Sequence, residues 1–152
     1  MTTTTTLAEL PGLAGQELGT SDWREVTQDA VNLFADATGD HQWIHVDVER
    51  AKAESPFGGP IAHGYLTLSL LVPLLAQALT VSDAAMGVNY GLNKVRFPSP
   101  VPVGSKVRAS ATLKDVTEFP GGLQYTLTVT VEREGGEKPV CIAEPVYRVY
   151  GG

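Results

Sequence analysis

The feature that most restricts the fold of this chain is an apolar stretch in its middle, residues 65–79, which carries no charged residue. Apolar residues stand at nearly every position, so the stretch predicts a helix that is buried on most sides. The Gly-Gly-Pro sequence before it predicts a loop that leads into the helix. Pro73 lacks a backbone N–H, so we expect a kink or a local loosening near it. Such a helix needs a sheet around it, and the rest of the chain has to supply that sheet.

Length and composition exclude several classes of protein. The apolar stretch is shorter than the roughly 20 residues that cross a bilayer, so we expect no membrane insertion. A net charge of −6 gives no electrostatic basis for binding nucleic acid. The single cysteine, Cys141, excludes an internal disulfide and is expected to be a small core residue. The threonine-rich start lacks the basic and apolar regions of a signal peptide, so we expect a cytoplasmic protein.

The 152 residues suit one domain with one core, of which we expect residues 1–10 to be partly disordered. Thr27 and Gly39 delimit a predicted helix, and Asp47 predicts the start of another. Stretches rich in Val, Thr and Tyr follow the apolar segment and predict strands, which we place at residues 86–97, 105–116, 123–132 and 140–150. Because proline and glycine turns separate them at hairpin-like intervals, consecutive strands are expected to be antiparallel. The pattern predicts an α+β fold, with a curved antiparallel sheet around a long central helix.

The residues suited to chemistry lie close together in the sequence. All three histidines fall between positions 41 and 63, and Asp40 belongs to the same segment. A carboxylate beside an imidazole, whose ordinary pKa is about 6.5, can hold and activate a water molecule. The start of the central helix offers backbone N–H groups, and at Gly64 no side chain hinders a ligand oxygen. We therefore select Asp40, His45 and Gly64 as candidate catalytic residues.

A metal site is an alternative use of the same histidines. His41 and His45 are four residues apart, and His63 would be a third ligand. However, no Cys or Glu stands out as a partner for the three or four ligands that zinc needs, so we expect no metal. A histidine is also often partly buried without any catalytic role, so each residue taken alone is weak evidence.

Two motifs together resemble the MaoC-like, (R)-specific enoyl-CoA hydratases, the hydratase 2 family. Residues 34–45, Phe-Ala-Asp-Ala-Thr-Gly-Asp-His-Gln-Trp-Ile-His, resemble the family signature, in which a histidine follows an aspartate by five positions. Residues 60–64, Pro-Ile-Ala-His-Gly, resemble the family's second hallmark, which opens the central helix. The segment with Arg96, Phe97, Pro100, Val101 and Gly104 resembles the strand and turn that follow. The resemblance covers nearly all of the chain beyond Leu18.

The resemblance implies a dimeric hot-dog fold and an enzyme, a hydro-lyase. The implied reaction is the reversible syn addition of water to a trans-2-enoyl-CoA, which gives the (R)-3-hydroxyacyl thioester. The CoA thioester is then the substrate, and no cofactor is implied. Carried over by position, Asp40 and His45 hold and activate the water, and the N–H of Gly64 polarises the thioester carbonyl.

The sequence departs from the family pattern where substrate binding is concerned. Gln42 and Trp43 replace an Asn-Pro pair, and the Gln42 amide is a candidate to support the loop or orient a catalytic partner. Val72 replaces a serine that bonds the aspartate in some members, so another group must orient Asp40. Candidate binding residues besides Gln42 are Phe57, Ile61, Tyr65 and Leu68 for the acyl group, and Lys94, Arg96, Lys106 and Arg108 for the CoA phosphates.

Two other functions stay open on the sequence alone. A hot-dog acyl-CoA thioesterase would share the thioester binding but attack the carbonyl carbon, and it would release free CoA thiol from a saturated acyl-CoA. A non-catalytic acyl-thioester-binding or regulatory subunit would bind acyl-CoA tightly without turnover. The sequence shows no DNA-binding helix pair or basic arm, which counts against a regulator.

Overall fold

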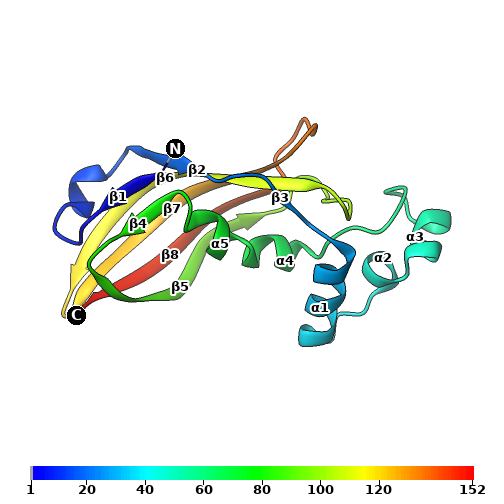
Figure 1. The fold of residues 1–152 in the computed structure, drawn as a ribbon, viewed down its shortest axis with the longest axis horizontal. Helices are drawn as coiled ribbons and strands as arrows, with labels where there is room; N and C mark the ends of the chain where they lie inside the picture. Colours follow the sequence, from blue (N-terminus) through cyan, green and yellow to red (C-terminus); the bar gives the residue numbers. More distant parts are fainter. Residues whose placement is uncertain (1) are drawn as a thin grey trace.

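The computed structural model describes residues 2–152 as one main sheet and a small two-stranded sheet, with helices on one face of the main sheet and at one end (Figure 1). The elements in chain order are β1 (Thr3–Thr5), the 3-10 helix η1 (Leu10–Leu13), β2 (Glu17–Thr20), β3 (Arg24–Glu25), α1 (Gln28–Thr38), α2 (Trp43–Val46), α3 (Val48–Glu54), α4 (Gly64–Ser69), α5 (Leu71–Leu75), β4 (Leu79–Val81), β5 (Ala84–Arg96), β6 (Lys106–Phe119), β7 (Gly122–Arg133) and β8 (Cys141–Gly151). Within the described chain, no helix is long and apolar enough to cross a membrane.

The main sheet is antiparallel and runs in the order β2-β6-β7-β8-β5, with β3 also paired to β6. β6, β7 and β8 form the hairpins that their turns predict. β5, by contrast, pairs with the last strand, β8, and not with β6, which follows it in the chain. The segment between them, residues 97–105, contains three prolines without N–H donors, and it crosses over instead of forming a hairpin. β5 is therefore an edge strand.

The central apolar stretch forms two short helices, α4 and α5, instead of the single long helix that the sequence predicts. The break falls at Leu70, because Pro73 has no N–H to donate to a carbonyl four residues earlier. One face of the helices packs on the sheet, where Leu66, Leu71 and Leu74 are buried. The opposite face is open in the single chain: Tyr65 is 71% exposed and Val72 is 54% exposed. The prediction of burial on most sides is wrong for that face.

The core lies between the helices and the inner face of the sheet. Alternate residues of β7, Leu127, Val129 and Val131, point inward and are fully buried or nearly so. Cys141 is also fully buried, which confirms its predicted place in the core, and burial raises the pKa of its thiol to about 11. The N-terminal threonines form β1, which pairs in parallel with β4. The prediction of partial disorder is therefore wrong for Thr3–Thr5.

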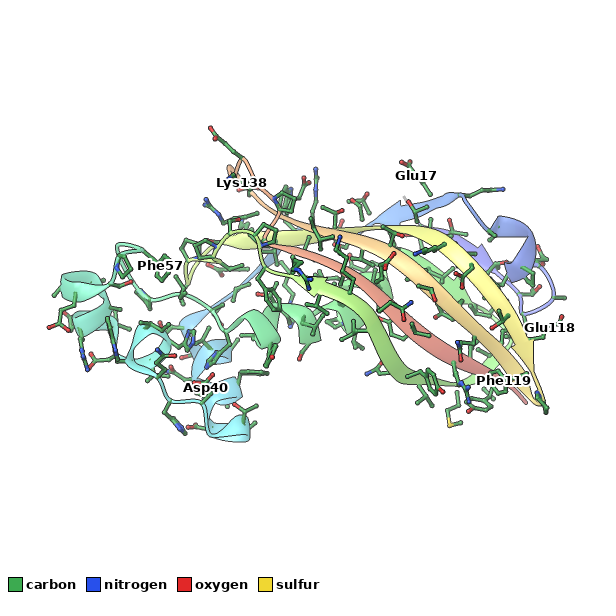
Figure 2. All side chains as sticks on the ribbon, turned by 180° about the vertical axis from the view of Figure 1, so that it is seen from behind. Glu17, Asp40, Phe57, Glu118, Phe119 and Lys138 are labelled. Atoms are coloured by element: carbon green, nitrogen blue, oxygen red, sulfur yellow. The ribbon has the colours of Figure 1, made fainter. Side chains whose placement is uncertain are left out.

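Helices α1, α2 and α3 extend beyond one end of the sheet (Figure 1). Their predicted caps are present: the Thr27 side chain accepts the N–H of Ala30 at 3.1 Å, and the Asp47 carboxylate accepts that of Arg50 at 3.1 Å. Gly39 ends α1 with a φ of 82°, which is the left-handed conformation that glycine adopts readily. Figure 2 shows Asp40 and Phe57 in this extension, at the end opposite to Glu118 and Phe119. Both candidate motifs are therefore held at one end of the molecule.

Candidate active site

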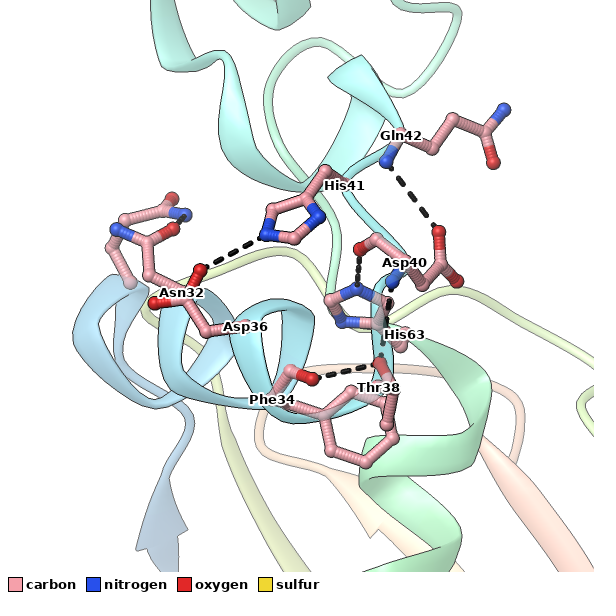
Figure 3. Close-up of polar contacts among 9 residues, drawn as sticks. Asn32, Phe34, Asp36, Thr38, Asp40, His41, Gln42 and His63 are labelled. Atoms are coloured by element: carbon pink, nitrogen blue, oxygen red, sulfur yellow. Dashed lines mark hydrogen bonds and ion pairs between the residues drawn. The ribbon is translucent and has the colours of Figure 1, made fainter.

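The structure brings the two motifs side by side through three hydrogen bonds. The backbone N–H of Ile61 donates to the carbonyl of Ile44 at 3.0 Å. The ring nitrogen Nδ1 of His45 lies 2.6 Å from the carbonyl oxygen of Ile61. The ring nitrogen Nε2 of His63 lies 2.9 Å from the carbonyl oxygen of Asp40 (Figure 3). The second motif is also tied to the crossing segment, because the N–H of Ala62 donates to the carbonyl of Val101 at 2.8 Å.

His45 is placed to act as a base. A carbonyl can only accept a hydrogen bond, so Nδ1 of His45 carries the proton and Nε2 keeps a lone pair. Within residues 2–152, Nε2 has no hydrogen-bond partner. The side chain is 7% exposed, and this burial lowers the pKa of His45 below the ordinary 6.5. The backbone of His45 is held in turn by the side-chain N–H of Gln28 in α1, which donates to its carbonyl at 2.8 Å.

Asp40 occupies the exposed turn between α1 and α2. Its carboxylate accepts the backbone N–H of Gln42 at 3.4 Å, and its own N–H points to the Thr38 hydroxyl at the same distance (Figure 3). The predicted role of the Gln42 amide is not seen, because its side chain extends away from Asp40 and its main chain makes the contact. One carboxylate oxygen of Asp40 and one ring nitrogen each of His45 and His63 lie within 4.8 Å of one another. The site therefore joins an acid group to a neutral imidazole.

The histidines are not arranged as the metal alternative requires. His41 lies outside the cluster, where its ring pairs with Asp36 at 2.9 Å, and that hydrogen bond raises the pKa of His41. The rings of His45 and His63 are stacked, with their centres 3.9 Å apart and their planes inclined by 26°. Imidazole lone pairs lie in the ring plane, so two stacked rings do not direct them to one ion at about 2.1 Å. The geometry suits proton transfer better than metal binding.

Gly64 begins α4, next to His63. Its backbone N–H has no acceptor within the described part of the chain, which leaves it available to a ligand oxygen. The ring of Phe97 packs over the glycine, so that a Cβ atom at this position would lie 3.1 Å from Cδ2 of Phe97. A side chain at this position would therefore be opposed by close packing against Phe97 and not by a left-handed backbone.

Two hollows flank the central helices. A cavity of about 340 Å³ adjoins Gly64 and is lined by the predicted acyl-binding residues Phe57 and Ile61, together with Phe97; Asp40 and His45 are not among its lining residues. A second cavity, of about 260 Å³, lies between α4–α5 and β5 and is lined by Leu68, Val72 and Tyr147. The structure thus supports Phe57, Ile61 and Leu68 as pocket residues.

The other predicted binding residues do not converge in the single chain. Tyr65 lies on the exposed face of α4, with its ring 6.2 Å from that of Phe97. Lys94 and Arg96 are exposed on β5, and the Arg96 guanidinium donates to the carbonyl of Val95. Lys106 is exposed, whereas Arg108 pairs with Glu132 and covers the ring of Trp23. A phosphate site built from these cations stays a prediction.

Sequence reasoning missed two residues that hold the site together. His63 is part of the Pro-Ile-Ala-His-Gly hallmark, so the motif could have indicated a role for it in the site. Gln28 carries no such signal, because only the folded chain brings the start of α1 against the carbonyl of His45. Each of these residues also contains a buried polar atom without a partner in the described chain, His63 Nδ1 and Gln28 Oε1.

An antiparallel sheet thus packs over the apolar helices α4 and α5, with Asp40 and His45 near the start of α4. Comparison with known proteins identifies the class to which this arrangement belongs. A model of the "MaoC like domain" matches residues 9–135. The chain is 56% identical over 149 residues to 3-hydroxyacyl-thioester dehydratase Z of Mycobacterium tuberculosis. The aligned residues cover 97% of this chain and 98% of that protein.

Two further relatives extend the comparison. Nodulation protein N of Rhizobium leguminosarum bv. viciae is 51% identical over 140 residues, covering 90% of this chain and 86% of that protein. Among solved structures, the (R)-hydratase from A. caviae involved in PHA biosynthesis matches with a TM-score of 0.71 at 27% identity, over 88% of this chain and 94% of that one. The chain belongs to the MaoC-like family, has its hot-dog fold and is a hydro-lyase.

Proposed function

We propose that this protein is an (R)-specific 2-enoyl-CoA hydratase, which adds water reversibly and with syn geometry to a trans-2-enoyl-CoA. The observation that carries the proposal is the approach of the Asp40 carboxylate to the His45 ring beside the start of α4, in a domain of the MaoC-like family. The names of the dehydratase from M. tuberculosis and the (R)-hydratase from A. caviae support the same chemistry, read in opposite directions.

The proposed mechanism assigns one task to each group. The Asp40 carboxylate and Nε2 of His45 hold a water molecule, and the lone pair on Nε2 receives its proton. The hydroxide oxygen bonds to C3, and the electrons of the double bond move toward the thioester carbonyl. The free N–H of Gly64 stabilises the enolate oxygen that develops there. The proton that Nε2 of His45 took from the water then passes to C2 on the same face, which completes the (R)-3-hydroxyacyl-CoA, so no cofactor and no metal take part in the proposed reaction.

The test follows the loss of enoyl absorbance with crotonyl-CoA and longer enoyl-CoAs, with chiral analysis of the product. Asp40→Asn and His45→Gln should each lower kcat by about 10²- to 10⁴-fold, because each removes a group that moves or orients a proton. His41→Gln is the matched control, since that histidine is exposed and lies outside the cluster. Near-full activity of both site variants, an (S) product, or release of free thiol from butyryl-CoA would contradict the proposal. The thiol result would favour a thioesterase.

We also propose that the protein acts as a homodimer that forms through β5. This strand pairs with β8 on one side only and exposes large apolar side chains along its length, namely Met86, Val88, Tyr90 and Leu92. A long, apolar, unpaired edge is a ready template for another strand. A second copy paired there would also lie near the open face of α4 and α5, which exposes Tyr65 and Val72.

A further inference from the structure

The two hallmark motifs are joined by a reciprocal pair of histidine contacts. His45, from the first motif, bonds to the backbone of the second motif at Ile61. His63, from the second motif, bonds to the backbone of the first motif at Asp40. The two rings stack on each other between these contacts, 3.9 Å apart. The arrangement clamps the aspartate and the histidine in one relative position.

The hydrogen bonds fix the two rings as opposite tautomers. His45 must carry its proton on Nδ1, because its partner is a carbonyl oxygen. For the same reason His63 must carry its proton on Nε2. Nδ1 of His63 is then a bare acceptor, and it is buried without a partner in the described chain. A donor on that atom would have no acceptor among the described residues, which agrees with the tautomer that carries its proton on Nε2.

We propose that His63 is a positioning residue for hydration: its Nε2–H holds the main chain of Asp40, and its ring supports that of His45. Residue 72 is a valine and cannot orient Asp40, whereas His63 contacts the main chain of Asp40 directly. It is suited to this task because it is 2% exposed and packs against Phe34 of α1 on another side, with ring centres 4.9 Å apart. The inference rests on the proposed hydratase function.

Two substitutions separate the hydrogen bond from the presence of a polar side chain. In His63→Gln, the amide nitrogen falls near the place of Nε2, so the donor to Asp40 is kept. In His63→Asn, the shorter side chain places its amide near Nδ1, so that donor is lost. His63→Gln should keep kcat within about threefold of the original, whereas His63→Asn should lower it about 10- to 100-fold at unchanged KM, because a displaced catalytic group slows chemistry.

The pH profile is the readout that a purely structural role would not move. Burial holds the pKa of His45 down, and the ring of His63 is part of that burial. Both His63→Asn and His63→Gln remove that ring, so both should shift the acidic limb of kcat toward 6.5, whereas only His63→Asn should also lower kcat. Equal losses in both variants with an unmoved limb, or full activity of His63→Asn, would overturn the proposal. Circular dichroism and melting temperatures check that both variants fold.

A measurement on the unchanged protein keeps the test independent of folding and of activity. Long-range ¹H–¹⁵N spectra of the imidazole rings at about pH 8 should show a protonated Nδ1 in His45 and a protonated Nε2 in His63. The same tautomer in both rings would contradict the reciprocal hydrogen bonds of His45 and His63, and with them the positioning role. If the tautomers are opposite but crotonyl-CoA is not hydrated, the proposed function is wrong, whereas the reciprocal hydrogen bonds of the two histidines are confirmed.

Discussion

At the scale of single residues, the proposed chemistry depends on a histidine whose environment suppresses its charge. Burial is the main cause that lowers the pKa of His45, and it outweighs the hydrogen bond to Ile61, which acts in the opposite direction. A depressed pKa keeps Nε2 free to accept a proton at neutral pH. The exposed His41 behaves in the opposite way, because its hydrogen bond to Asp36 raises its pKa.

The lowered pKa of His45 predicts how stability depends on pH. Between the folded pKa and the ordinary value of about 6.5, the unfolded chain binds more protons than the folded one. The contribution of His45 to the free energy of unfolding is therefore complete above about 6.5 and is lost as the pH falls through its folded pKa. Urea unfolding between about pH 5 and 8 should show a smaller fall toward acid for His45→Gln than for the original chain. An unchanged slope would mean that His45 titrates normally in the folded protein.

A second prediction at the scale of single residues concerns the substitution of Gly64 by alanine. In Gly64→Ala the new methyl group would lie 3.1 Å from the Phe97 ring, so the ring or the start of α4 must move. If the helix start moves, the N–H leaves the enolate oxygen, and kcat should fall by about 10- to 100-fold. Replacing Phe97 with leucine in the same chain should restore part of the loss. A double variant no better than Gly64→Ala would show that contact with Phe97 is not the cause.

At the scale of elements, the caps of α1 and α3 and the stretches that form the main strands could be predicted, because they depend on local residues such as Thr27, Gly39 and Asp47. The pairing of β5 with β8 could not, because sheet order depends on contacts between residues far apart in the sequence. The same holds for the site. The motif spacing predicted Asp40 and His45 as a pair, and the structure places them close together, whereas the contact of Gln28 with the carbonyl of His45 exists only in the folded chain.

The break between α4 and α5 can be tested at Pro73. Pro73→Ala restores an N–H that can donate to the carbonyl of Ser69, so the two helices should join across Leu70. The free energy of unfolding should rise by about 1 kcal/mol, since the gain in the helix outweighs the entropy that proline removes from the unfolded chain. Far-ultraviolet circular dichroism and urea unfolding measure both effects. No gain in helicity would show that packing, and not proline, sets the break.

At the scale of the whole molecule, the main sheet of the single chain ends in the free edge of β5. Two lysines introduced at Val88 and Leu92 should prevent pairing at the free edge, because like charges would meet across it. Sedimentation should then give the mass of one chain, 16.1 kDa, in place of two. Thr128→Lys is the control, since Thr128 is exposed on the inner strand β7 and away from the edge. A dimer that survives both lysines would place the interface elsewhere.

The burial of Cys141 has a practical consequence. The only thiol of the chain lies inside the sheet, and its raised pKa of about 11 keeps it protonated and unreactive at neutral pH. A sulfhydryl reagent can reach it only when β8 separates from its neighbours. Each labelling event therefore records one opening of the core, so the labelling rate of Cys141 measures how often the native state opens locally.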